Sequence, residues 1–293
     1  MNTKHAGMEK TLAIAGFMVI TIIWGSTFVV MKNSIDMLSP AYVLAYRFTI
    51  ASLGLAVLFH KRLMQINRRD LHCGTVLGLL LGMSYVFQTY GLQHTTASKN
   101  AFITTLYVII VPFLHWVING ARPRRNNLVA AVLAVIGLAF ISLNGEQGIN
   151  LGDVLTFLCS VFLAWHMVYV DRYTRHRDPV ILTVLQIMTS AVLFWILAFA
   201  AEGVRDVREL FNWQIAWPLL YLGLIASMVG FLVQNVGQKY LSPNTASILL
   251  SFESVFGLIF SVIFLKETVT AKMLAGCALM FAAAIISEYR AGN

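Results

Sequence analysis

The amino-acid sequence predicts an all-α polytopic membrane protein with ten transmembrane helices, arranged as two inverted repeats of five helices. Composition is the first observation behind this prediction: of 293 residues, 58% are hydrophobic and 12% are charged, whereas soluble domains contain about 25% charged residues. The second is a succession of apolar runs of about 20 residues, the length that crosses a bilayer as a helix. The third is that the second half of the chain matches the first at a nearly constant offset.

Ten apolar runs account for nearly the whole chain. Runs of this length predict helices, because a membrane-spanning strand needs only about 10 residues. The first run is too long for the apolar core of a signal peptide, so it is expected to remain as a helix. The predicted spans are residues 11–31, 41–60, 71–91, 99–119, 127–144, 151–170, 179–200, 214–234, 243–265 and 271–287. They leave no room for a separate domain outside the membrane.

The segments between the spans contain residues that interrupt helices or remain in water. Pro and Gly break helices, and clustered Lys, Arg and Glu residues are costly in hydrocarbon. In chain order the breaks are marked by residues 39–40, 61–70, 120–125, 144–146, 172–179, 202–209, 242–244 and 266–268. These signals indicate where one predicted helix ends and the next begins.

The basic residues are distributed unequally between the two sides of the membrane. The chain has 21 Lys and Arg residues and a net charge of +8. With a cytoplasmic N-terminus, the predicted spans place fourteen of them on the cytoplasmic side and six on the other, and Arg47 lies within the second span. Such an asymmetry orients membrane helices during insertion. It therefore predicts cytoplasmic N- and C-termini, and no nucleic-acid partner is expected.

The sequence contains no recognisable cofactor or metal motif. Cys73, Cys159 and Cys277 are far apart and each lies in an apolar run, which favours unpaired thiols over a disulfide or a zinc site. The motifs G-x-x-x-x-G-K-[ST], H-E-x-x-H and G-x-S-x-G are absent. We therefore expect no cofactor, no bound metal, no ATP-driven activity and no hydrolytic chemistry.

The two halves of the sequence resemble each other. At an offset of 145, Ala101 pairs with Ala246 and Ile103 with Ile248 without a gap. At 146, residues 88–91 fall on residues 234–237, and at 141 Trp24 falls on Trp165. The pattern predicts a first repeat at residues 1–145 and a second at residues 146–293.

An odd number of crossings in each repeat has a consequence for function. The second repeat must enter the bilayer from the side opposite to the first, so the repeats are inverted. Two similar halves of opposite orientation can exchange inward-open and outward-open shapes around one central site, which is the architecture of secondary transporters. The repeat therefore predicts a transporter with its site between the halves.

Two ionisable residues are expected deep inside spans. Glu253 lies roughly 15 Å into the ninth span, near the middle of a hydrocarbon core of about 30 Å, and Arg47 lies within about 5 Å of the same depth. Buried charges in a membrane tend to mark substrate or proton pathways. For Glu253 the alternative is a structural hydrogen bond to a neighbouring helix. For Arg47 the alternatives are a pair with Glu253 or a substrate carboxylate, or a side chain that reaches the outer interface.

Aromatic and amide side chains inside the spans are further candidates for a substrate site. Trp24 and Tyr107 lie deep and are predicted to form cavity walls. Trp165 carries the same kind of side chain in the sixth span, with an interfacial anchor as the alternative. Gln88 and Gln234 lie near span ends, where they either contact a substrate or cap helices.

Several segments together resemble a known family. They are Trp24-Gly25-Ser26-Thr27-Phe28, Arg47, residues 96–104 with Val111-Pro112, and Leu250-Ser251-Phe252-Glu253 with residues 264–270. They are similar to motifs of the drug/metabolite transporter superfamily, specifically its ten-helix EamA-type permeases, and the resemblance covers almost the whole chain. Ser254 departs from the pattern because many relatives have proline after the glutamate. Pro112 is expected to supply a kink in the first repeat.

The resemblance implies a multi-pass permease of the bacterial inner membrane, often an exporter of amino acids or other small metabolites, commonly coupled to an ion gradient. The resulting hypothesis is alternating access around a cavity between the halves, with protonation of Glu253 helping to reset it. The expected partners are a small-molecule substrate, a proton and the lipid bilayer.

Two other function classes remain as alternatives. One is a membrane-embedded enzyme that uses Glu253 with His115 or His166 as an acid/base pair, although both histidines are expected near the cytoplasmic helix ends, away from Glu253 in depth. The other is a non-transporting membrane sensor or scaffold.

Overall fold

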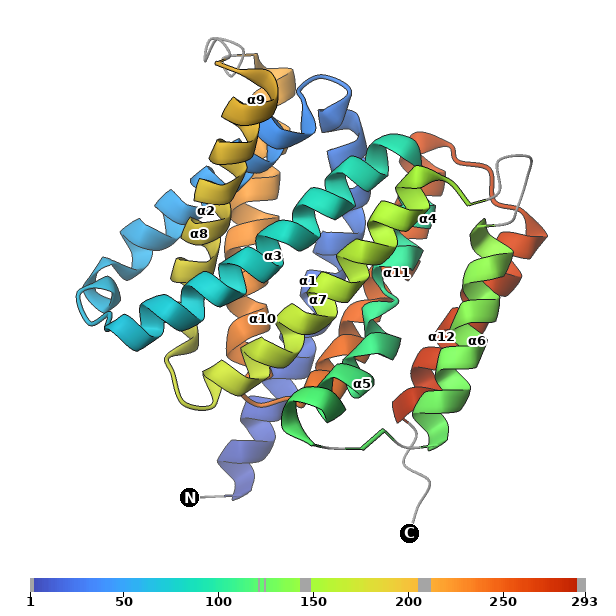
Figure 1. Ribbon diagram of the computed structural model, residues 1–293, viewed down its shortest axis with the longest axis horizontal. Helices are drawn as coiled ribbons and strands as arrows, with labels where there is room; N and C mark the ends of the chain where they lie inside the picture. Colours follow the sequence, from blue (N-terminus) through green and yellow to red (C-terminus); the bar gives the residue numbers. More distant parts are fainter. Residues whose placement is uncertain (1–2, 121, 124, 143–148, 205–211, 289–293) are drawn as a thin grey trace.

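The computed structural model describes residues 3–120, 122–123, 125–142, 149–204 and 212–288. The predicted division between residues 145 and 146 lies outside these ranges. So do four of the basic residues in the predicted charge asymmetry, Arg124, Arg205, Arg208 and Arg290. Within the described ranges the chain is all-helical, as predicted (Figure 1).

The ten predicted spans correspond to ten helices or interrupted helices. In chain order they are α1 (Thr3–Ile35), α2 (Pro40–Leu63), α3 (Arg68–His94), α4 (Ala97–Thr104) with α5 (Tyr107–Asn119), α6 (Arg125–Ser142), α7 (Leu151–Thr174), α8 (Pro179–Glu202), α9 (Trp213–Leu220) with η2 (Tyr221–Val229) and α10 (Gly230–Gln238), α11 (Pro243–Leu265) and α12 (Ala271–Glu288). Eight of the described helices are long and apolar enough to cross a membrane, and α6 and α12 contain shorter apolar stretches. The protein is a polytopic membrane protein.

Most helices extend beyond the predicted spans because polar residues cap them. Asn67 and Asp70 form a reciprocal capping box at the start of α3, and Asn150 and Asp153 form another at the start of α7. In each case both side chains satisfy backbone N–H groups that have no partner within the helix. A proline in the first turn begins α2, α8 and α11, where its missing N–H is tolerated.

The fourth span is interrupted at Thr105 and Leu106. Here the hydrogen bonds tighten to a three-residue spacing: Leu106 N–H donates to Ile103 O (3.1 Å) and Val108 N–H to Thr105 O (3.0 Å). Tyr107 therefore starts a new helix, and Pro112 lies inside that helix rather than at the interruption. The ninth span is continuous through Ser254.

The eighth span contains a π-helical segment, η2, between α9 and α10. A π-helix takes one more residue per hydrogen-bonded turn than an α-helix. Before this segment, the equivalent helices α3 and α9 begin 145 residues apart. After it, α4 and α11 begin 146 residues apart, and so do α6 and α12. The step of one residue therefore coincides with η2. Identities at an offset of 145 beyond this point, such as Ala101 with Ala246, are therefore out of register by one residue. They arose by chance, because apolar sequences of similar composition share many identities.

The helices of the two repeats interlock in equivalent pairs. α2 packs on α8, and α6 packs on α12 along one edge of the bundle (Figure 1). α3 packs on α7 and α8, and its equivalent span, α9 to α10, packs on α1 and α2. α1 packs on α11, as α7 packs on α4 and α5. The exchange of partners is what a two-fold relation between inverted repeats requires.

Close packing across the repeats follows the same relation. A Cβ at Gly78 in α3 would lie 2.5 Å from Thr189 Cβ in α8, and a Cβ at Gly223 would lie 2.8 Å from Ile50 Cβ in α2. Helix backbones approach each other at these two equivalent glycines because no side chain separates them. The described chain begins and ends at the same end of the bundle, as an even number of crossings requires (Figure 1).

Candidate functional site

A small cavity lies between the two repeats. Spans one, three and four line it from the first repeat, and the equivalent spans six, eight and nine line it from the second. Its walls are formed by Trp24, Thr27, Phe28, Tyr85, Gln88, Thr104, Tyr107, Leu163, Met167, Phe231, Gln234, Leu250 and Glu253. Five of the seven residues predicted as a site therefore line one cavity.

The two repeats contribute equivalent positions to the cavity. In spans three and four and their counterparts, each lining residue has an equivalent 146 positions later. These pairs are Tyr85 with Phe231, Gln88 with Gln234, Thr104 with Leu250, and Tyr107 with Glu253. In spans one and six the separation is 139, which pairs Trp24 with Leu163 and Phe28 with Met167. The cavity thus surrounds the axis that relates the repeats.

Glu253 lies in the middle of α11 and is 5% exposed. The Tyr107 hydroxyl donates a hydrogen bond to Glu253 Oε1 at 3.1 Å. The two interpretations of Glu253 are therefore not exclusive, because the carboxylate bonds to a neighbouring helix and also lines the cavity. Since Tyr107 and Glu253 are equivalent positions, their hydrogen bond lies across the axis between the repeats.

Arg47 lies behind the cavity wall and is 2% exposed. Its Nε donates to Ser227 Oγ at 2.6 Å and its Nη2 to the Tyr85 hydroxyl at 3.3 Å. The guanidinium carbon also lies 4.8 Å from the centroid of the Tyr85 ring. Among the described residues Arg47 forms no ion pair with Glu253, and it does not reach the interface. It fixes the position of Tyr85, which does line the cavity.

Trp24 forms one wall of the cavity. Its indole Nε1 donates to Ala226 O in η2 at 2.9 Å, and its ring packs against Phe231 with centroids 5.3 Å apart. Gly230 leaves room for the indole, because a Cβ there would lie 2.5 Å from Trp24 Nε1. The first span is thereby attached to the eighth on the cavity side.

Gln88 lines the cavity from the first repeat and Gln234 lines it from the second. Neither side chain caps a helix. Gln88 Nε2 donates to Thr104 Oγ1 at 3.3 Å. Gln234 is buried, and its Oε1 has no hydrogen-bond partner among the described residues.

Trp165 lies apart from this cavity. Its ring stacks on Tyr169, with centroids 6.1 Å apart. The offset of 141 that aligned it with Trp24 differs by two residues from the separation of 139 in the structure, and two residues turn a helix by about 200°.

His166 is fully buried with Nε2 3.0 Å from Gln186 Oε1, so the structure does not bring it to Glu253 in the cavity.

Eight of the thirteen lining residues were not predicted as site residues, among them Tyr85, Thr104 and Phe231. Tyr85 precedes Gln88 by three residues, and Phe231 precedes Gln234 by three, so each pair shares one face of a helix. The offset of 146 links the two pairs. Tyr85 and Phe231 could therefore have been predicted from the repeat, because each shares a helix face with a glutamine that was already a candidate.

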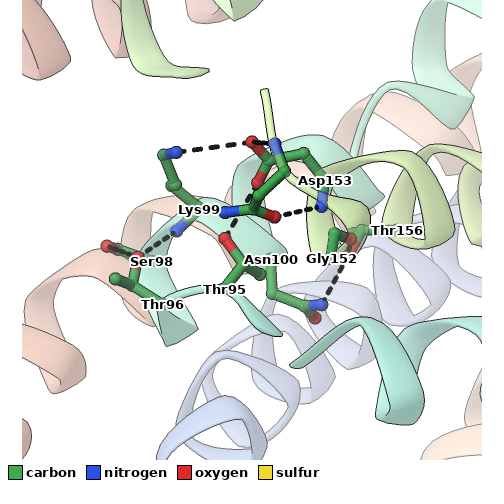
Figure 2. A network of polar contacts seen from close by, with 9 residues as sticks. Thr95, Thr96, Ser98, Lys99, Asn100, Gly152, Asp153 and Thr156 are labelled. Atoms are coloured by element: carbon green, nitrogen blue, oxygen red, sulfur yellow. Dashed lines mark hydrogen bonds and ion pairs between the residues drawn. The ribbon is translucent and has the colours of Figure 1, made fainter. Parts of the chain in front are cut away.

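A second polar cluster lies at the end of the bundle opposite to the start of α1 (Figures 1 and 2). We call it the α4–α7 network, because the first turns of α4 and α7 meet there. Lys99 Nζ lies 3.4 Å from Asp153 Oδ2, and the Thr95 hydroxyl donates to Asp153 Oδ1 at 2.8 Å. Asn100 Nδ2 donates to Thr156 Oγ1 at 2.8 Å.

Glu267, from the loop between α11 and α12, extends the network to the second repeat. Its carboxylate accepts hydrogen bonds from Ala97 N–H at 2.8 Å, from Ser98 N–H at 3.2 Å and from the Ser98 hydroxyl. A carboxylate at a helix N-terminus binds free N–H groups and interacts favourably with the helix dipole. The start of α4 is therefore attached to both α7 and the α11–α12 loop.

Comparisons with known proteins agree along the whole chain. The model of the EamA-like transporter family matches residues 11–143 and 150–289. An "Uncharacterized transporter" of Archaeoglobus fulgidus is 31% identical over 284 residues, covering 97% of this chain and 88% of that protein. The "Uncharacterized transporter YoaV" of Bacillus subtilis is 24% identical over 273 residues, covering 90% and 92%. A solved structure described as "Crystal structure of protein" has a TM-score of 0.72 at 16% identity, covering 95% of this chain and 96% of that one, and shares the fold.

Proposed function

Because this chain belongs to the EamA-like transporter family, which is not a family of enzymes, we propose that it is a secondary transporter that exports a small metabolite of amino-acid size by alternating access. The observation that carries the proposal is the cavity between the repeats, lined by equivalent positions of both halves and containing the carboxylate of Glu253. Two inverted halves around one site are suited to exposing that site to each side in turn.

The units that move in this proposal are the two repeats, residues 1–145 and 146–293. Tyr107 and Glu253 bond to each other across the axis that relates these units. A site on that axis keeps the same distance from both halves when they exchange shapes. Glu253, with Trp24, Gln88 and Gln234 around it, is therefore the proposed substrate site in both orientations, and Arg47 positions it through Tyr85.

The energy source in this proposal is a proton gradient. A carboxylate that is buried in a membrane protein and faces a cavity binds either a proton or a cationic group to balance its charge. Protonation of Glu253 would then return the empty transporter to its starting orientation. We place the protein in the bacterial inner membrane with both termini in the cytoplasm, which the unequal distribution of basic residues supports.

Reconstitution into liposomes tests the proposal. Vesicles loaded with amino acids and related metabolites should exchange at least one of them, chemically unchanged, in a protein-dependent manner. Glu253→Gln should lower that flux at least about tenfold, because a charged hydrogen-bonding group is lost from the site. The remaining flux should no longer respond to an imposed pH gradient. Glu9→Gln, which changes an exposed carboxylate outside the cavity, is the matched control.

Two results would contradict the proposal. One is the absence of any protein-dependent flux, and the other is full flux with unchanged pH dependence in Glu253→Gln.

A further inference from the structure

We infer that the cavity selects solutes that carry an amine and lack a free carboxylate, with an apolar or aromatic body. The inference rests on the proposed transport function and narrows its substrate class. An amino acid, a zwitterion, would be a poorer ligand than the amine of the same skeleton. Three features of the cavity support this: its charge, its hydrogen-bonding groups and its walls.

Glu253 is the one group of the described lining that can carry a full charge near neutral pH, and that charge is negative. Glu253 is the only carboxylate among the described lining residues, and none of them is Lys, Arg or His. Arg47 is separated from the space by Tyr85, and two of its nitrogens donate to Ser227 and Tyr85. A charge in a low-dielectric site is stable only when it is paired. An ammonium group would balance Glu253, whereas a ligand carboxylate would add a second negative charge without a partner.

The hydrogen-bonding groups of the cavity favour a donor ligand. Three donors of the lining are already used inside the protein: the Tyr107 hydroxyl, the Gln88 amide and the Trp24 indole. Two of the acceptors in the lining accept no hydrogen bond within the described chain. Gln234 Oε1 is buried without a partner in the described chain, and Glu253 Oε2 accepts no hydrogen bond from the described residues. An ammonium group is a compact donor of three hydrogen bonds and accepts none.

The walls suit the rest of such a ligand. Trp24, Phe28, Tyr85 and Phe231 present aromatic rings, and ring faces attract cations in addition to packing on apolar groups. Leu163, Met167 and Leu250 close the opposite side with aliphatic groups.

Four matched ligands test the inference: phenethylamine, phenethyl alcohol, phenylalanine and 3-phenylpropanoate. They share a phenyl ring and a two-carbon spacer but differ in the charged group. Calorimetric titration of the purified full-length protein should give phenethylamine a dissociation constant at least about tenfold lower than each of the others. The inference is overturned if phenethylamine binds no more tightly than the other three, or if phenylalanine or 3-phenylpropanoate binds more tightly.

Two variants separate the charge effect from general loss of structure. Glu253→Gln keeps the size of the side chain and should abolish the preference for phenethylamine over phenethyl alcohol, a ratio measured with both ligands on the same variant. Gln234→Leu should lower that preference several-fold through the loss of one acceptor. A preference that survives in both variants overturns the inference.

Flux of radiolabelled phenethylamine and phenylalanine in proteoliposomes distinguishes failure of this inference from failure of the proposed function. Phenethylamine that binds selectively but shows no protein-dependent flux, with no other solute moved, would contradict transport and leave the binding preference intact. Movement of phenylalanine without movement of phenethylamine would support transport and overturn the inference.

Discussion

Two equivalent helix junctions, that of α4 with α7 at one end of the bundle and that of α11 with α1 at the other, are stabilised by different chemistry. At one end, the α4–α7 network joins helix starts through Lys99, Asp153 and Thr156. At the other end, the position equivalent to Thr156, 139 residues earlier, is Phe17. There, a Cβ at Gly237 would lie 2.5 Å from Phe17 Cε2, just as a Cβ at Gly91 would lie 2.6 Å from Thr156 Oγ1.

The remaining positions of the network follow the same rule. Each polar residue is replaced by an apolar or uncharged one at the opposite end. The equivalents are Ile14 for Asp153, Thr245 for Lys99, Leu241 for Thr95 and Ala246 for Asn100. At these equivalent positions the first junction depends on hydrogen bonds and an ion pair, and the second on packing. Elsewhere at the second end of the bundle, Arg62 pairs with Asp178 and Arg177 with Asp70.

This difference matters because alternating access requires the two ends to open in turn. With identical chemistry, the inward-open and outward-open states would have similar free energies. Different chemistry gives each state its own free energy, so the ratio of their populations is a property of the two ends. Substitutions at equivalent positions can measure each end separately.

The largest effect is expected at the apolar junction, where Phe17 packs on Gly237. Phe17→Ala removes a fully buried ring against Gly237 and leaves an empty space. Such truncations lower the free energy of unfolding by about 3–5 kcal/mol. The midpoint of thermal unfolding in detergent measures the loss, with Phe17→Leu as a control that should lose less than half as much. A loss for Phe17→Ala no greater than that for Asp153→Asn would contradict the role of packing at this end.

A smaller effect is expected from the charge at the polar end. Asp153→Asn keeps one oxygen for the Thr95 hydroxyl, but an NH2 group replaces the oxygen that accepts from Asn150 N–H and lies opposite Lys99. We expect a loss of about 1.5–3 kcal/mol, the contribution of a hydrogen bond to a charged group. In a double-mutant cycle with Lys99→Met, the two changes should be less than additive by about 1 kcal/mol. Full additivity would show that Lys99 and Asp153 do not stabilise each other.

The smallest effect is expected from a single neutral hydrogen bond. Thr156→Val keeps the shape of the side chain but removes one of the two acceptors of Asn100 Nδ2, while Gln88 O remains the other. The expected loss is about 1 kcal/mol. Thr156→Ser, which keeps the hydroxyl, serves as the control in the same thermal measurement. Equal stability of Thr156→Val and the unchanged protein would mean that Asn100 finds another acceptor at this end.

The sequence predicted the helices well because the beginning and end of each can be recognised from the order of residues along the chain. Apolar runs end where Pro, Asn, Asp or basic residues begin, and those residues are also the caps observed at Asn67 and Asn150. The irregular stretches at Thr105–Leu106 and in η2 were not predicted. Both lie inside apolar segments, where the composition is the same whether the backbone is regular or not.

The site was predicted in part for a related reason. Counting residues along a span gives the depth of a side chain but not the direction in which it points. Arg47 and Glu253 were expected at similar depths, yet Tyr85 is the hydrogen-bond partner of Arg47. In membrane helices most faces are apolar, so hydrophobic periodicity does not show which face meets the cavity. At Gln88 and Gln234 the match between the repeats indicated the face that meets the cavity. At Trp165 the alignment was wrong by two residues, so it indicated the wrong face.

The extra residue in η2 bears on how a duplicated gene can diverge. A single-codon insertion in a regular helix would turn everything downstream by about 100°. Phe231 and Gln234 would then point away from their counterparts Tyr85 and Gln88. Wider π turns between Tyr221 and Val229 accommodate the added residue locally, so the downstream side chains keep their original phase. One half of the molecule has thus changed its length while both halves still meet face to face.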